Sequence, residues 1–195
     1  MTWLWIIVDK ILRRIYKIKP VVPGADGIIG LEVRVYRGTP IVFSDGMRLE
    51  QGECILDIHL NSAWFVINKK MNRERRWEWE VLSVMSRELA LLASQVRTGR
   101  YGDIRALHTM TVLDAGARRL GFETQVKPPS PGRFWQEFYL ARLMSAYYLN
   151  TTARVKTPGH RQDLYEGWLS VAQLLKKYPA VAESPVSSRT GTLPP

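Results

Sequence analysis

The sequence predicts a single α+β domain: a small antiparallel sheet near the N-terminus, extended by a β-α-β passage and packed by about four helices. Short alternating runs of apolar and polar residues, joined by tight turns between residues 30 and 61, predict the sheet. Later segments with apolar residues every three or four positions predict the helices. The length of 195 residues, with 46% hydrophobic and 24% charged residues, suits one folded domain.

An amphipathic helix is predicted over residues 2–18. Its apolar stripe keeps the spacing of a helix face and comprises Leu4, Val8, Ile11, Ile15 and Ile18. Two tryptophans followed by several cations are typical of a helix that lies in a membrane surface. The candidate membrane contacts are Trp3, Trp5, Lys10, Arg13 and Arg14. The alternative is a terminal helix that docks on the domain and leaves its charges in solvent.

The sheet is predicted to begin with a strand over residues 31–36 and a shorter strand over residues 39–43. The Asp45-Gly46 pair is a strong hairpin signal, and Gln51-Gly52 turns the chain into a last strand over residues 54–61. Because these turns are tight, we expect each strand to lie beside its predecessor.

The last of these strands has two unlike faces, because successive side chains of a strand point to opposite sides. One face is aliphatic and consists of Cys54, Leu56, Ile58 and Leu60. The other face carries Asp57, His59 and Asn61, which we take as candidate catalytic residues for acid–base chemistry. If the first strand pairs in register, Glu32, Arg34 and Tyr36 line the same face and are candidate ligand-binding residues.

The second half of the chain is predicted to be mainly helical. Residues 73–96 keep a helical spacing for more than five turns and end before Thr98-Gly99. A β-α-β passage over residues 103–126 contains a short helix capped by Thr109 or Thr111 and closed by Gly121.

Two more helices are predicted at residues 133–149 and 162–178. The domain is expected to span residues 1–179, and the polar, proline-bearing residues 180–195 to form a disordered tail.

Composition bounds the location and the partners. A single cysteine, Cys54, excludes a disulfide within the chain and fits a reduced compartment. The start of the chain lacks the pattern of a secretory signal, so we expect a cytoplasmic protein, peripheral at the inner face of the membrane if the first helix binds there. The net charge of +10 favours an acidic lipid surface or a phosphate-bearing sugar intermediate as partner.

Motifs for nucleotide cofactors and for serine hydrolases are absent from the sequence, and no cofactor is predicted. The three histidines lack the spacing of a helical metal pair. Only a meeting of Asp57, His59 and His108 in space would make a metal site, and no metal is predicted.

Residues 69–76 form a basic cluster interleaved with aromatic residues, which is compatible with nucleic-acid binding. Glutamates interrupt the cluster and are placed for pairing along the helix, so nucleic acid is the least favoured partner.

Four segments carry a resemblance to a known family: ILRRIYKIKP, VYRGTPIVFSDGMRLEQGECILDIHLN, ARRLGF and HRQDLYEGWLSVAQLLKKY. On these segments the chain resembles the YkoP-like domain family of small bacterial proteins over most of residues 1–178. The resemblance implies a domain that occurs alone or appended to polysaccharide-deacetylase-like enzymes, with glycosyltransferases as frequent companions. It supplies no catalytic residue, and the chain lacks the metal-binding motifs of a deacetylase.

Three functions therefore stand as expectations. The first is an accessory or binding domain in cell-envelope polysaccharide or glycolipid metabolism, with glycosyltransferases or deacetylase-like enzymes as partners. The second is an enzyme of unknown reaction that uses Asp57 and His59. The third is a nucleic-acid-binding protein that uses residues 69–76.

Overall fold

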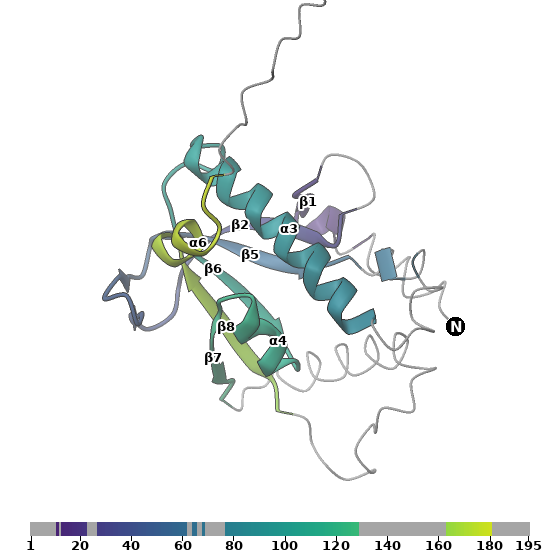
Figure 1. Ribbon diagram of the computed structural model, residues 1–195. Coiled ribbons are helices and arrows are strands. Elements are labelled where there is room, and N and C mark those ends of the chain that lie inside the picture. Colours follow the sequence, from purple (N-terminus) through teal and green to yellow (C-terminus); the bar gives the residue numbers. More distant parts are fainter. Residues whose placement is uncertain are drawn as a thin grey trace, which may run out of the picture.

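A six-stranded mixed sheet forms the centre of the protein (Figure 1). The computed structural model describes residues 11, 13–22, 27–61, 64–65, 68, 77–128 and 163–180. The sheet strands are β1 (Lys19–Pro20), β2 (Ile29–Val35), β5 (Cys54–Leu60), β6 (Ile104–Thr111), β7 (Glu123–Val126) and β8 (Tyr165–Ser170). A separate hairpin consists of β3 (Ile41–Val42) and β4 (Arg48–Leu49), and the helices are α3 (Trp77–Arg97), α4 (Asp114–Arg119) and α6 (Val171–Lys177). The predicted α+β class is confirmed.

The strands are ordered β1-β2-β5-β6-β8-β7, and only the β5–β6 pair is parallel. Parallel neighbours need a crossover connection, and the helix α3 lies in the segment between them. Both β6 and β7 run antiparallel to β8, which lies between them. The predicted β-α-β passage is therefore present, but β8 separates its two strands.

The neighbours of β5 differ from the prediction. The hairpin β3–β4 forms at Asp45-Gly46 as expected, with φ +82° at Gly46. It does not join the main sheet, however, and β5 pairs with β2 along all seven of its residues. The hairpin is thus an insertion between two strands that pair with each other, and the expectation that each strand lies beside its predecessor was wrong.

The predicted helix over residues 162–178 was also wrong in its first half. Residues 165–170 form β8, and the helix begins only at Val171. Ser170 is its N-cap: its hydroxyl accepts from the backbone N–H of Gln173, whose side chain accepts in turn from the N–H of Ser170. Because β8 lies inside the sheet, apolar side chains occur on both of its faces and mimic a helical spacing.

Two further boundaries are corrected or confirmed by the backbone. The strand β6 continues through Thr111, so neither Thr109 nor Thr111 caps the following helix, and the residue before α4 is Leu113. Gly99 and Gly121 follow α3 and α4 with φ of +74° and +101°, as the predicted stop signals require.

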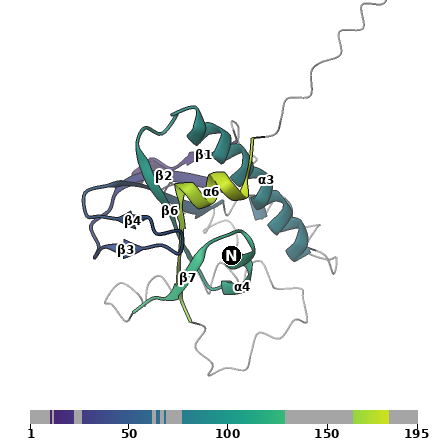
Figure 2. The ribbon, with the colours of Figure 1, turned by 60° about the vertical axis from the view of Figure 1, so that its left-hand side comes forward.

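Each face of the sheet packs against a different layer (Figures 1 and 2). The helix α3 covers one face, where Leu89 and Leu92 join Leu56 and Leu107 in the main core. On the other face the β3–β4 hairpin contributes to a second apolar cluster, which consists of Tyr36, Phe43, Leu49, Ile55, Ala106 and Trp168.

Several predictions concern residues outside the described part of the chain. These are the first ten residues with Trp3, Trp5 and Lys10, the basic cluster at residues 69–76, the helix at residues 133–149 and the tail after residue 180. They stay predictions.

Glu88 connects α3 to the start of β2. Glu88 is 6% exposed, and its carboxylate accepts hydrogen bonds of 2.8 Å from the backbone N–H groups of Ile28 and Ile29. Both of these residues are fully buried. Burial raises the pKa of Glu88, although the two N–H donors act in the opposite direction.

We expect Glu88→Ala to lower the free energy of unfolding by about 3 kcal/mol, because two buried N–H groups lose their acceptor. Urea denaturation measures this change. The exposed Ser83 on the same helix supplies the control, and Ser83→Ala should change stability by less than about 0.5 kcal/mol. Equal stabilities for the two variants would contradict the anchoring role.

Candidate functional site

Five ionisable side chains gather on the face of the sheet opposite α3, and we call them the polar strip. The strip consists of Glu32, Arg34, Asp57, His59 and His108. Glu32 is the direct cross-strand partner of Asp57, and Asp57 is in turn the partner of His108 on the parallel strand β6. The register therefore brings together Glu32, Arg34, Asp57 and His59, as expected from sequence, and adds His108.

Asp57 is the centre of the strip. It is 5% exposed, and its two carboxylate oxygens have different partners. Oδ1 accepts from Nδ1 of His108 at 2.9 Å, and Oδ2 pairs with the guanidinium of Arg34. Burial alone would raise the pKa of Asp57, but the hydrogen bond from His108 and the charges of His108, His59 and Arg34 outweigh it and lower that pKa.

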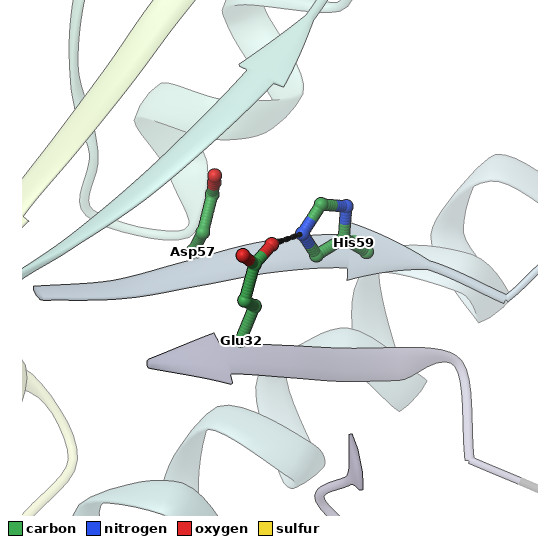
Figure 3. A group of neighbouring side chains, drawn as sticks. All are labelled: Glu32, Asp57 and His59. Carbon is green, nitrogen blue, oxygen red and sulfur yellow. Dashed lines mark hydrogen bonds and ion pairs between the residues drawn. The ribbon is translucent and has the colours of Figure 1, made fainter. Parts of the chain in front are cut away.

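A second carboxylate–imidazole pair lies beside the first. Nε2 of His59 is 3.3 Å from Oε2 of Glu32, and the two side chains are 33% and 18% exposed. In Figure 3 the side chains of Glu32, Asp57 and His59 project from β2 and β5 on the same side of the sheet. One ligand atom of each lies within 4.8 Å of the others, so the described residues include a candidate cation-binding group.

His108 is the functional candidate that sequence reasoning undervalued. Its ring lies against Trp168 on β8, with centroids 4.3 Å apart. Because Nδ1 is held by Asp57, the other ring nitrogen, Nε2, is the free one: it has no hydrogen-bond partner among the described residues and is not fully buried. A carboxylate that holds Nδ1 in this way orients an imidazole for proton transfer or ligand binding at Nε2.

Two sequence-predicted candidates are engaged elsewhere. Tyr36 is buried in the second apolar cluster, and its hydroxyl donates to the carbonyl of Thr39. Burial, followed by the nearby charge of Glu166, raises the pKa of Tyr36. Asn61 is 7% exposed and donates from Nδ2 to the carbonyl of Gly27 at 2.8 Å. Both side chains hold neighbouring loops in place.

The aliphatic side of β2 is exposed in the second half of the strand. Val33 and Val35 are 55% and 50% exposed, whereas Tyr36 is buried. The edge strand β1 pairs with β2 only at Gly30 and Leu31, so the later part of β2 has no strand partner on that side among the described residues.

The end of the first helix lies beside the polar strip. A side chain at Gly30 would collide with Ile18, whose Cγ2 lies 2.5 Å from the position of a Cβ atom, and would crowd the guanidinium of Arg13. Gly30 is the cross-strand partner of His59. The helix therefore approaches the same face of the sheet as the strip, because residues 30 and 32 point to the same side.

The other side of this helix end is exposed. Ile11, Ile15 and Tyr16 are 52%, 65% and 50% exposed, and Arg14 and Lys17 lie beside them in solvent. Of the apolar stripe that the sequence predicts for the first helix, the described residues therefore point only partly toward the domain. Ile18 packs against the sheet, whereas Ile11 and Ile15 do not.

The fold and the strip together define a class: an α+β domain with a charged cluster on the sheet face opposite α3. The family model of the YkoP domain matches residues 1–178, and the chain belongs to this family, as the resemblance in the sequence implied. Neither the curated proteins nor the solved structures contain a match. Within the described residues, no helix has the length and apolar character that crossing a membrane requires.

The lowered pKa of Asp57 predicts a specific acid sensitivity. A carboxyl group whose pKa is lower in the folded state contributes stability above its unfolded pKa and loses it as the pH falls through the folded value. We expect the wild type to lose more stability than Asp57→Asn between pH 5 and about pH 2.5, as measured by chemical denaturation at each pH.

The exposed Asp103 serves as the control. Asp103→Asn should keep the acid sensitivity of the wild type. If Asp57→Asn also kept it, Asp57 would not be an ionised, stabilising group in the folded protein.

Proposed function

We propose that this YkoP domain is an accessory binding domain, peripheral to the inner face of the cytoplasmic membrane, that serves cell-envelope polysaccharide or lipid-linked sugar metabolism. The observation that carries the proposal is the position of the polar strip next to a helix end with exposed apolar and basic residues. A molecule with a polar head and a membrane-embedded tail fits this combination.

The membrane part of the proposal rests on the exposed helix end. Ile11 and Ile15 are one helical turn apart and share one side of the helix, and the exposed Arg14 lies next to them. Apolar residues that enter the interface, together with cations that attract anionic lipid, are the two contributions that hold a peripheral helix on a membrane. The net charge of +10 acts in the same direction.

The ligand part rests on the composition of the strip. Carboxylates such as Glu32 accept hydrogen bonds from the hydroxyl groups of a sugar, and the half-exposed Arg34 donates to a phosphate or a ring oxygen. The family resemblance to domains appended to polysaccharide-deacetylase-like enzymes supports a sugar ligand. It also supports glycosyltransferases or deacetylase-like enzymes as partners.

Vesicle flotation tests the membrane part. We expect the wild type to float with vesicles that contain phosphatidylglycerol and to bind phosphatidylcholine vesicles more weakly. Ile11→Gln with Ile15→Gln should weaken binding at least about tenfold, because two apolar side chains no longer leave water.

The matched control is Val42→Gln, which removes an apolar side chain that is 66% exposed on the β3–β4 hairpin. This variant should bind as the wild type does. Equal losses in both variants, or no binding by the wild type, would argue against the membrane role.

A second candidate function is an enzyme that uses proton transfer, and the pairing of His108 with Asp57 favours it. Asp57 and His108 share the 2.9 Å hydrogen bond, which adds His108 to the predicted pair of Asp57 and His59. If a phosphate-bearing sugar is turned over, His108→Gln should lower kcat at least about 100-fold, as expected for the loss of a general base. Product formation followed by chromatography would show it. Unchanged turnover in the variant would exclude His108 as the base.

A further inference from the structure

We propose that Glu32, Asp57 and His59 form a binding site for one divalent transition-metal ion, such as Zn²⁺. The inference deepens the ligand-binding role proposed above and rests on it for its biological meaning. Metal binding is measured without vesicles or sugar, so the two proposals fail separately.

The backbone places the three ligands close together. Glu32 and Asp57 are directly opposite each other on the antiparallel strands β2 and β5, and His59 follows Asp57 on the same face. One ligand atom of each lies within 4.8 Å of the others. Because all three stand on paired strands rather than on loops, their relative positions are fixed by the ladder of the sheet.

The separation of His59 and Glu32 is compatible with two ligands of one ion as well as with their direct ion pair. Charge-assisted hydrogen bonds between nitrogen and a carboxylate oxygen measure about 2.7–2.9 Å, and the observed distance is 3.3 Å. Two ligands of a tetrahedral ion with bonds of about 2.0–2.1 Å lie about 3.4 Å apart. The pair therefore already has the spacing of two ligands of one tetrahedral metal ion.

The type and number of ligands indicate the class of ion. One imidazole nitrogen and two carboxylate oxygens suit zinc, manganese or cobalt. Three protein ligands leave a fourth position for water or for an oxygen of a bound molecule, as in catalytic zinc sites. His59 is one-third exposed, so this position is accessible from solvent. An ion there would also let an overall acidic group of side chains hold a phosphate-bearing sugar.

The imidazole of His108 holds the carboxylate of Asp57, the third of the proposed metal ligands. His108 donates to Oδ1 of Asp57, and metal-bound carboxylates are usually hydrogen-bonded by such outer groups, which fix their orientation. His108 is buried and its ring lies against Trp168, so its own position is fixed by packing.

Arg34 competes with the metal ion, and this makes the proposal testable. Its guanidinium pairs with Oδ2 of Asp57 and is 49% exposed, so it can move into solvent when an ion binds. With neutral histidines, Glu32, Asp57 and Arg34 together carry one negative charge. Removal of Arg34 leaves two negative charges and should strengthen the binding of a divalent ion. Arg13, near Gly30, is a second cation that the bound ion must tolerate.

The experiment is a titration of the chelator-treated full chain with Zn²⁺ by calorimetry, and with Co²⁺ by visible absorption. We expect one ion per chain with a Kd below about 100 µM, and absorption bands typical of tetrahedral Co²⁺. His59→Gln and Glu32→Gln should each weaken binding at least about tenfold, and Arg34→Gln should tighten it, because a positive charge is removed.

Two variants serve as controls. Glu50→Gln removes an exposed carboxylate of the hairpin, and His160→Gln removes a histidine distant in sequence. Both should bind as the wild type does. Far-ultraviolet circular dichroism shows which variants are folded. If a ligand variant unfolds, Arg34→Gln still tests the proposal, because it keeps all three ligands.

Three results would overturn the proposal. The first is a wild type without binding below about 100 µM. The second is undiminished binding in folded His59→Gln. The third is weaker binding in folded Arg34→Gln, which would mean that Arg34 and Asp57 form a structural ion pair and not a site that a metal ion shares.

Discussion

The arrangement of the polar face depends on the carboxylate of Asp57. Its two oxygens are shared between Arg34 on β2 and His108 on β6, so one buried charge connects three adjacent strands. A buried charge is costly unless it is paired and hydrogen-bonded. The partners of Asp57 compensate this charge, and the carboxylate that they hold lies close to Glu32 and His59 on the same face of the sheet.

The two faces of the sheet serve different purposes. On the side of α3, aliphatic residues of β5 and β6 make the main core. On the opposite side an apolar cluster that includes residues of the hairpin adjoins the polar strip, and Trp168 contacts both: its ring packs with Tyr36 and with His108. Packing and charge are thus coupled through one tryptophan, whose Nε1 is buried without a hydrogen-bond partner among the described residues.

Local signals in the sequence were sufficient for the parts of the fold that depend on neighbouring residues. Asp45-Gly46 predicted the hairpin, and the alternation along β5 placed Asp57 and His59 on one face. His108 could not be assigned to this face, because the parallel pairing of β5 with β6 is set by the α3 crossover and not by any short pattern. The strand β8 was mistaken for a helix because Leu164, Trp168, Val171 and Leu175 follow a helical spacing. Gly167, which lies among them, is the residue that argues against a helix. In the structure a Cβ atom at this position would lie 2.9 Å from Cγ2 of Thr109, so the close pairing of β8 with β6 requires glycine.

The position of β8 has a consequence for how the chain reaches its folded state. Among the described strands β8 is the last in the sequence, yet it lies between β6 and β7 and supplies the sheet hydrogen bonds of β7. Until residues 165–170 leave the ribosome, β6 exposes an unpaired edge and β7 has no strand to pair with. The described sheet is therefore completed by β8. A nascent chain whose synthesis stalls before residue 165 leaves the edge of β6 open to pairing with other chains.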